Sequence, residues 1–158
     1  DIHSWIQENI YSNKYDRKEV KERVFKWLYN PKAQNKKLNS YFERDKIIEK
    51  YFDGEFIKNP FDRKIKVDER RAVNYLIQSS TNDLVLRQAL KIHEFLKDTK
   101  SFIAFVIHDS IVVDIHREQK SQIEEMVKIF SETEMGIFKT NLSMGRNFGD
   151  MRAVEWQQ

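Results

Sequence analysis

The sequence predicts an α+β fold, with helices in the first half of the chain and an antiparallel β-hairpin at the centre of the second half. The stretch FIAFVIHDSIVVDI contains two apolar, β-branched runs that flank the polar residues His108, Asp109 and Ser110. Such runs predict strands at 101–107 and 110–115, joined by a tight turn. A carboxylate is costly to transfer out of water unless it is paired or binds a metal. We therefore expect Asp109 at the tip of the hairpin, held over a cleft.

Apolar residues recur at helical spacing in four other segments. They predict helices at about 17–29, 42–52, 68–97 and 117–132. Asp16 and Asp68 directly precede two of these helices and are expected to be their N-caps. A weaker strand is expected near 140–146. Turn residues cluster from Asp53 to Lys64, which marks the best boundary between two parts of the chain.

The composition excludes a disordered chain and gives no sign of secretion. Of the 158 residues, 40% are hydrophobic and 13% are aromatic, which is enough for one ordinary core or two small lobes. The absence of cysteine fits a reducing compartment, and no apolar run is long enough to cross a bilayer. The chain opens at Asp1 without Met or a leader, so we expect a piece of a longer protein and no membrane partner.

Positive charge is concentrated in the first part of the chain. Residues 1–66 carry a net charge of +5, whereas residues 67–158 carry a net charge of −2. An imbalance of this size is usual for a solvated surface and raises the odds of a polyanionic partner only slightly.

The helix expected at 17–29 carries two cations followed by two aromatic residues on one stripe. Its members are Arg17, Lys21, Phe25 and Tyr29, which are spaced four apart and drift over about 120° of the helix surface. A neighbouring apolar stripe, expected to pack on the core, comprises Val20, Val24, Trp27 and Leu28. A ligand with phosphates at one end and a flat base at the other would match the first stripe. The alternative is an ordinary amphipathic helix with surface cations and two core aromatics.

The stretch RKEVKERVFKWLYN resembles the fingers helix of family A DNA polymerases, the bacterial DNA polymerase I group with its phage and mitochondrial relatives. The pattern of that helix is RxxxKxxxFxxxYG. All four residues of the stripe match it, while Asn30 stands in place of the glycine.

Three further motifs follow the family order. The DIH of residues 1–3 resembles the DIH or DVH that precedes the fingers helix. The stretch ERRAVNYLIQSSTNDL resembles a segment that usually ends in QGTAAD, and its matching residues are Arg70, Asn74, Gln78 and Asp83. The HDS of residues 108–110 resembles the HDE of the third motif, with Ser110 in place of Glu. Together the four matches cover nearly the whole chain.

Two departures from the family bear on activity. Far fewer residues separate Tyr29 from Arg70 than in a bacterial polymerase, so the fingers resemble the trimmed ones of phage-like enzymes. The first metal-binding motif of the family, a DYSQ-like strand with the other indispensable Asp, is expected upstream of Asp1. The resemblance therefore implies a C-terminal fragment with a fingers portion at 1–58 and a C-terminal palm portion at 59–158.

The resemblance implies a role for each matching residue in template-directed incorporation of dNTPs. Asp109 is the catalytic, metal-binding carboxylate and belongs to a set that holds two Mg²⁺ ions, the second Asp lying upstream. The nucleotide-binding residues are His3, Arg17, Lys21, Phe25 and Tyr29. The first three contact the triphosphate, the phenylalanine stacks beside the base and sugar, and the tyrosine closes the pocket. The DNA-binding residues, on the primer–template side, are Arg70, Asn74, Gln78 and His108.

Two functions from different classes remain open. The first is a segment of a DNA-directed DNA polymerase, whose partners are primer–template DNA, dNTPs and the missing N-terminal segment in the same or another chain. The alternative is a non-catalytic module that holds primer–template DNA. A pure DNA binder has no use for the stripe, which favours the polymerase, although we expect the isolated fragment to be inactive. The expected location is the cytoplasm of a bacterial or phage-infected cell, with an organelle as the alternative.

Overall fold

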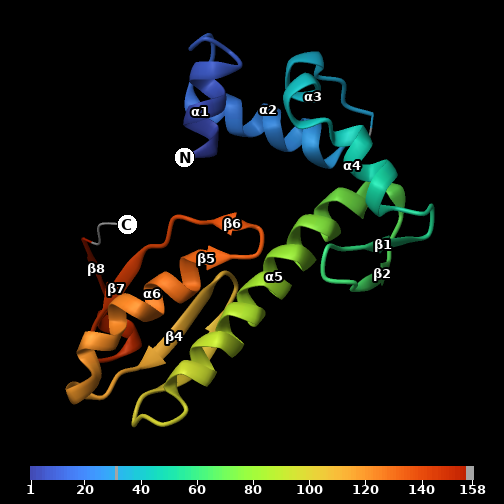
Figure 1. Ribbon diagram of the computed structural model, residues 1–158. Helices are drawn as coiled ribbons and strands as arrows, with labels where there is room; N and C mark the ends of the chain where they lie inside the picture. The colour runs from blue at the N-terminus through green and yellow to red at the C-terminus, as the bar shows by residue number, and fades with distance from the viewer. Residues whose placement is uncertain (31, 156–158) are drawn as a thin grey trace. The chain divides into compact units, whose positions relative to one another are not determined.

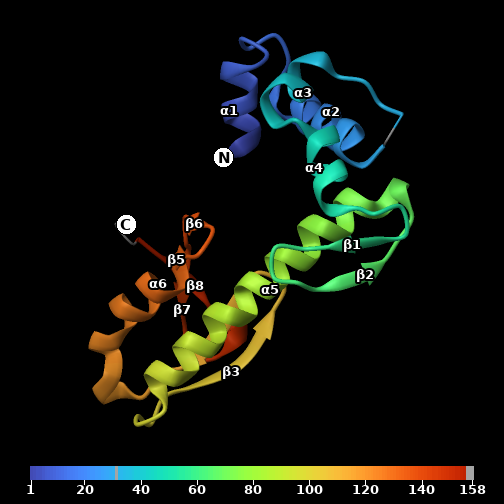
Figure 2. The same ribbon diagram turned by 45° about the vertical axis from the view of Figure 1, so that its right-hand side comes forward.

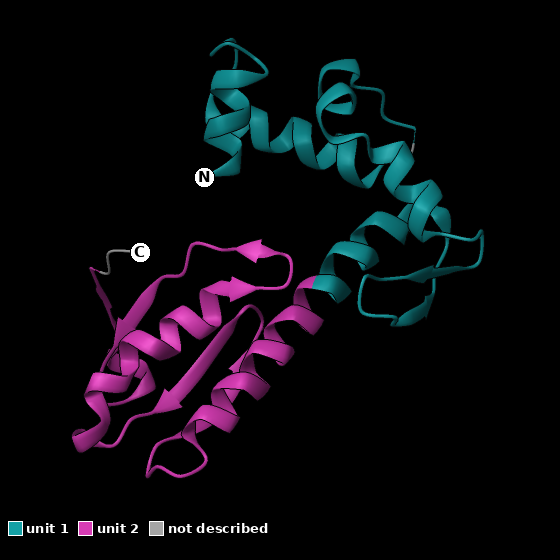
Figure 3. Ribbon diagram, viewed as in Figure 1, with its two compact units in different colours: residues 1–80 teal, residues 81–158 magenta. Residues whose placement is uncertain are grey.

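The structure is a computed structural model that describes residues 1–30 and 32–155. Backbone contacts divide it into two compact units, residues 1–80 and residues 81–158 (Figure 3). Helices occur together with short antiparallel strands, so the predicted α+β class is confirmed. None of the described helices is long and apolar enough to cross a membrane. The boundary between fingers and palm that we predict after residue 58 is a functional one, and it stays a prediction.

The first unit consists of helices and one small β-hairpin (Figure 1). The helices are α1 Ile2–Asn9, α2 Arg17–Tyr29, α3 Lys36–Phe42, α4 Arg44–Tyr51 and α5 Glu69–Leu96, and the boundary between the units falls inside α5. The hairpin pairs β1 Phe56–Lys58 with β2 Lys64–Lys66. It lies beside the first half of α5 in both views (Figure 1 and Figure 2).

The second unit is built around a longer hairpin. Its strands are β3 Phe102–Ile107 and β4 Ser110–Asp114, followed by the 3₁₀ helix η1 Arg117–Gln122 and by α6 Ile123–Ser131. Shorter elements complete it, namely β5 Glu132–Thr133, β6 Gly136–Ile137, β7 Leu142–Met144, η2 Phe148–Asp150 and β8 Arg152–Val154. Antiparallel pairs join β5 to β6 and β7 to β8.

Most of the predicted elements are confirmed, and the differences have local causes. The helices predicted at 17–29 and 68–97 and both hairpin strands lie where expected. The helix predicted at 117–132 is wrong over its first six residues, which form a 3₁₀ helix with a non-helical Gln119 at φ −112°. The sequence pattern missed α1 and α3, which have eight and seven residues and therefore show too few turns for a clear period.

The apolar stripe of α2 lies in the core of the first unit, as predicted. Val20, Val24 and Trp27 are buried, and they pack with Ile6 of α1 and Leu38 of α3. Burial of this stripe fixes the rotation of α2 about its axis, because the helix period places the opposite side in solvent.

A buried arginine closes the C-terminal end of α2. The Arg44 side chain is 5% exposed, and its Nη1 donates to the carbonyl oxygens of Trp27 and, at 3.1 Å, of Asn30. On its other side, Arg44 Nη2 pairs with Asp45 Oδ1 at 3.2 Å. The last carbonyls of a helix have no partner within the helix, and a cation is favoured at that end of its dipole. Arg44 therefore holds the loop that follows α2.

In the second unit, α5 and α6 cover one face of the β3–β4 hairpin. Ile92 and Leu96 of α5 pack with Met126 of α6, and Ile103 and Val113 of the hairpin lie against them. This face accounts for only part of the apolar runs that the sequence pattern assigned to strands, because Phe102, Phe105 and Ile107 of β3 are exposed.

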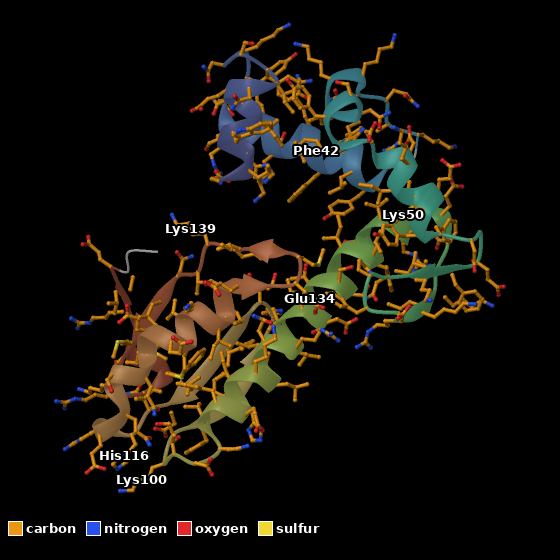
Figure 4. The ribbon with its side chains drawn as sticks, in the orientation of Figure 1. Phe42, Lys50, Lys100, His116, Glu134 and Lys139 are labelled. Carbon is orange, nitrogen blue, oxygen red and sulfur yellow. The ribbon has the colours of Figure 1, made fainter. Side chains whose placement is uncertain are left out.

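Polar contacts also hold the end of α6 and the turn between β5 and β6 against α5. Gln88 is 2% exposed, and its Nε2 donates to the carbonyl oxygens of Ile129 and, at 2.8 Å, of Glu132. Glu134, labelled in Figure 4 on the turn between β5 and β6, accepts from Arg87 Nε of α5 at 2.5 Å. A buried amide that satisfies two carbonyls fixes the end of α6.

Replacing Arg44 should destabilise the first unit. Arg44→Ala leaves buried carbonyl oxygens at the end of α2 without donors, which should lower the free energy of unfolding by about 3 kcal/mol. Urea unfolding followed by tryptophan fluorescence measures this, because Trp5 and Trp27 both belong to the first unit. Lys46→Ala, at an exposed position on α4, the helix that also carries the buried Arg44, is the control and should change the free energy of unfolding little. An Arg44→Ala protein as stable as this control would contradict the assignment.

Candidate functional site

The start of α2 is fixed by reciprocal capping bonds. Asp16 Oδ1 accepts from the Glu19 backbone N–H at 2.8 Å, and Glu19 Oε2 accepts from the Asp16 backbone N–H at 3.1 Å. Asp16 is therefore an N-cap, as predicted, and the two carboxylates form a capping box. The capping box therefore fixes the residue at which α2 begins.

The stripe predicted to be free for a ligand is exposed to solvent. Arg17, Lys21 and Phe25 are exposed and Tyr29 is half-buried. The Phe25 residue is 42% exposed, although an apolar ring of this size would be stabilised by burial. The alternative of a helix with two core aromatics is thus wrong for Phe25.

Side chains gather around the Phe25 ring within the first unit. The His3 ring of α1 meets it edge-on, with centroids 5.8 Å apart. Lys21 Nζ lies 5.5 Å from its centroid, and the Tyr29 ring lies 5.7 Å away. The structure therefore brings together four of the five residues predicted to bind a nucleotide.

Arg17, the fifth residue, is held at the start of α1 by a carboxylate that the sequence reasoning missed. Its Nε donates to Asp1 Oδ2 at 2.5 Å. Asp1 is also the N-cap of α1, where it accepts from the backbone N–H of His3 at 3.2 Å and from Ser4 Oγ at 3.0 Å. An acidic residue directly before a short helix was the signal available for Asp1.

His3 lies in a positive environment. The pKa of His3 is lowered from its ordinary 6.5, first because burial disfavours the charged ring and then because Arg17 and Lys21 repel a proton. Its Nδ1 is buried and has no hydrogen-bond partner among the described residues. A ring that is neutral at pH 7 beside two cations can gain a proton when an anion arrives.

The predicted DNA-binding residues of α5 form a polar stripe in the first unit. Arg70 and Gln78 are exposed and Asn74 is half-buried, and Gln78 Nε2 donates to Asn74 Oδ1 at 3.1 Å. Ala72 and Leu76 are buried with the β1–β2 hairpin. At about 100° per residue the polar stripe lies on the other side of α5 from these two residues, which leaves it open to a ligand.

His108 and Asp109 form the two-residue turn of the β3–β4 hairpin, as predicted. Ile107 pairs with Ser110 directly beneath them, and both turn residues are exposed. His108 has a φ of 51°, in the left-handed region that few non-glycine residues adopt. The apolar flanks are thus buried on one face only, and the ionisable pair stands at the solvated end of the hairpin.

Asp109 does not form a metal site with the other described side chains. Among residues 1–30 and 32–155, no group of three His, Asp or Glu side chains could hold a metal ion. Two divalent cations require several carboxylates. The residues present therefore do not fit a two-metal site by themselves. Asp109 belongs to the second unit and the α2 stripe to the first, so the cleft over which we expect Asp109 to be held stays a prediction.

The chain thus combines an exposed stripe of cations and aromatic rings with a carboxylate at a hairpin turn in an α+β fold. Comparison with known families gives the particular family. Residues 7–150 match the model of DNA polymerase family A, and the chain belongs to that family.

Individual relatives agree with the family. The chain is 28% identical over 114 residues to DNA polymerase I of Caldicellulosiruptor bescii, which covers 58% of this chain and 13% of that protein. It is 26% identical over 155 residues to the DNA polymerase of Bacillus phage SP01, which covers 89% of this chain and 16% of that protein. For the DNA polymerase of Mycobacterium phage D29, the identity is 29% over 108 residues, covering 64% of this chain and 17% of that protein. The chain thus spans about a sixth of these relatives.

Binding of an anion at the α2 stripe should be coupled to proton uptake by His3. A triphosphate beside Arg17 and Lys21 offsets the charges that lower the pKa of His3, so this pKa should rise on binding. Tripolyphosphate affinity should therefore increase as the pH falls from about 8 to about 6, more in the unchanged chain than in His3→Gln. Calorimetry in buffers of different ionisation enthalpy measures the proton uptake.

The His3→Gln variant is also the control for titration of the ligand itself, which affects both proteins equally. The same pH dependence in both proteins would contradict a role for His3 at this site.

Proposed function

We propose that this chain provides the nucleotide-binding fingers and the later part of the palm of a DNA-directed DNA polymerase. The observation that carries the proposal is the exposed cluster around Phe25, where a histidine, a lysine and a tyrosine surround an uncovered ring in a member of DNA polymerase family A. The relatives named DNA polymerase support a role in DNA replication.

Each residue of the cluster has a proposed role in binding an incoming dNTP. Arg17, Lys21 and a protonated His3 neutralise the triphosphate through charge-assisted hydrogen bonds. Phe25 stacks beside the base and sugar, which covers the exposed ring, and Tyr29 closes the end of the pocket. Asp1 positions Arg17 through the ion pair of 2.5 Å.

Primer–template DNA is proposed to lie along the polar stripe of α5 and at the tip of the β3–β4 hairpin. Arg70, Asn74, Gln78 and His108 are the proposed contacts. Amide and imidazole groups can reach the acceptors that all base pairs share in the minor groove, so these contacts hold DNA without choosing its sequence.

Catalysis is proposed to need a polypeptide segment beyond this chain. Asp109 supplies one carboxylate for Mg²⁺, and the other indispensable Asp is proposed to come from a DYSQ-like strand in the same or another chain. The relatives are about six to eight times as long as the matched region, which supports such a segment. The bacterial and phage relatives support the cytoplasm of a bacterial or phage-infected cell as the location.

A non-catalytic module that holds primer–template DNA is the alternative. It explains the α5 stripe equally well, but it gives no reason for an exposed phenylalanine between a histidine and a lysine. Nucleotide-dependent activity distinguishes the two functions.

Primer extension tests the polymerase. The isolated chain should not extend a primer, because a single carboxylate cannot hold two cations in the geometry that phosphoryl transfer requires. Joined to a preceding palm segment that bears the first-motif Asp, the protein should incorporate dNTPs with Mg²⁺. Asp109→Asn should then abolish extension while DNA binding is retained, and Lys21→Ala should mainly raise the dNTP concentration needed.

Matched controls lie close to both positions. Asp114→Asn removes an exposed carboxylate from the far end of the same strand pair. Lys26→Ala removes an exposed cation that lies about 140° around α2 from Lys21. Neither should lower extension appreciably. Metal-dependent extension by the isolated chain, or an active Asp109→Asn protein, would refute the site assignment.

Binding of primer–template DNA should weaken with salt and depend little on sequence. Phosphate contacts release counterions, so the logarithm of the affinity should fall linearly with the logarithm of the salt concentration. Binding isotherms at several salt concentrations, with two duplexes of unrelated sequence, measure both effects. Affinity that is independent of salt, or a strong preference for one duplex, would count against the proposed contacts.

A further inference from the structure

The first unit carries more lysine and arginine than the two in the nucleotide stripe, the four residues Arg17, Lys21, Phe25 and Tyr29 of α2. Residues 14–37 contain nine Lys and Arg but only three Asp and Glu, and two of those acids form the capping box of α2. Only Arg17 has an ion-pair partner, Asp1, within the part of the chain that the structure describes. The eight cations without one are Lys14, Lys18, Lys21, Arg23, Lys26, Lys32, Lys36 and Lys37.

Elsewhere in the chain, ion pairs are common. Lys46, Lys58, Lys66 and Arg71 each meet a carboxylate within 2.7 Å in the same unit. Like charges repel one another, so a concentration of uncompensated cations costs stability unless an anion binds there.

Part of this excess is organised around an aromatic ring away from the nucleotide stripe. Arg23 Cζ lies 3.7 Å from the centroid of the Tyr15 ring, and Lys14 Nζ lies 5.5 Å from it. Arg23 follows Lys21 by two residues, which places it about 200° around α2. This second cluster is therefore on the opposite side of the helix from the side chains that surround Phe25.

Hydrogen bonds hold the loop that carries the second cluster. The backbone N–H of Lys14 donates to the Tyr11 carbonyl at 3.0 Å, and that of Asn13 donates to the Gln7 carbonyl at 2.9 Å. The Tyr11 ring packs edge-on against Tyr15, with centroids 5.2 Å apart. The cluster is thus attached to the core and is not a mobile tail of charges.

A further lysine joins the cluster from α3. Asn35 Nδ2 donates to the Tyr11 hydroxyl at 2.6 Å, which ties the start of α3 to the same tyrosine pair. Two residues later, Lys37 Nζ donates to the Ile10 carbonyl at 3.4 Å, directly beside Tyr11. Cations from three parts of the chain therefore converge on one side of the first unit.

We propose that Lys14, Tyr15, Arg23 and Lys37 form a binding surface for single-stranded nucleic acid, separate from the nucleotide stripe. Cations that converge on a partly exposed aromatic residue suit a strand with phosphates on one side and unstacked bases on the other. The planar guanidinium of Arg23 over the Tyr15 ring offers a stacking platform for a base. The choice of nucleic acid over another polyanion rests on the proposed polymerase function.

Fluorescence anisotropy with a fluorescein-labelled oligothymidylate of about 12 nucleotides tests the surface, since single-strand sites of this kind span several nucleotides. The double variant Lys14→Glu, Arg23→Glu should bind at least tenfold more weakly than the unchanged chain. The slope of log affinity against log salt should shrink by about 1.4, because two phosphate contacts on a single strand are lost.

A matched control distinguishes binding at this surface from a general effect of the net charge of the chain. Lys91→Glu, Lys128→Glu changes the net charge equally, and both lysines are exposed residues of the second unit. This variant should keep both the affinity and the salt slope. Tyr15→Leu should weaken binding about fivefold without changing the slope, because stacking involves no counterion. Circular dichroism confirms that each variant is folded.

Equal losses in the double variant and its control would overturn the inference, because net charge would then explain the binding. Unchanged affinity in the double variant would also overturn it and leave an acidic protein as the better partner for the surface. Neither result bears on the proposed polymerase function, which is tested separately by primer extension with variants of Lys21 and Asp109. Conversely, selective loss in the double variant supports the surface even if the joined protein fails to extend a primer.

Discussion

The buried guanidinium of Arg44 is the interaction on which the first unit depends. It donates to the carbonyl oxygens of Trp27 and Asn30, so the helix that ends at Tyr29 and the loop after it are held together by one side chain. Burial of the apolar stripe fixes the rotation of α2, and Arg44 fixes its end. Together they hold the rotation of α2 in which Arg17 and Phe25 are exposed.

With α2 fixed in this way, its two sides carry two different clusters of side chains. One side surrounds the Phe25 ring with His3, Lys21 and Tyr29. The pKa of His3 is lowered there first by burial and then by the neighbouring cations. The other side stacks Arg23 on Tyr15. A nucleotide bound as proposed covers the Phe25 ring only, so the Tyr15 ring stays available to the single strand that we propose binds there.

Sequence periodicity predicted the parts that depend on long, regular patterns. The stripe of α2 lies as expected because its four-residue period is visible over 13 residues. The strands flanking Asp109 lie as expected because apolar, β-branched runs fill most of their 11 residues. Asp1 and Arg44 could not be found in this way, since each acts through a tertiary contact with a residue 14 to 17 positions away. The β1–β2 hairpin was missed for a different reason, because each strand turns a single isoleucine inward.

The two units differ in how many of the groups needed for their proposed roles they supply. The first unit holds two cations, one neutral imidazole and two aromatic rings in mutual contact or connected by Asp1, so the proposed triphosphate and base have partners within one compact body. The second unit offers one carboxylate at a strained turn, where φ of His108 is 51°. Strain of this kind persists only where surrounding structure holds it, and here the Ile107–Ser110 pair of the hairpin closes the turn. Because one carboxylate cannot hold two divalent cations, the hairpin tip is the part of this chain whose proposed chemistry depends most on further carboxylates.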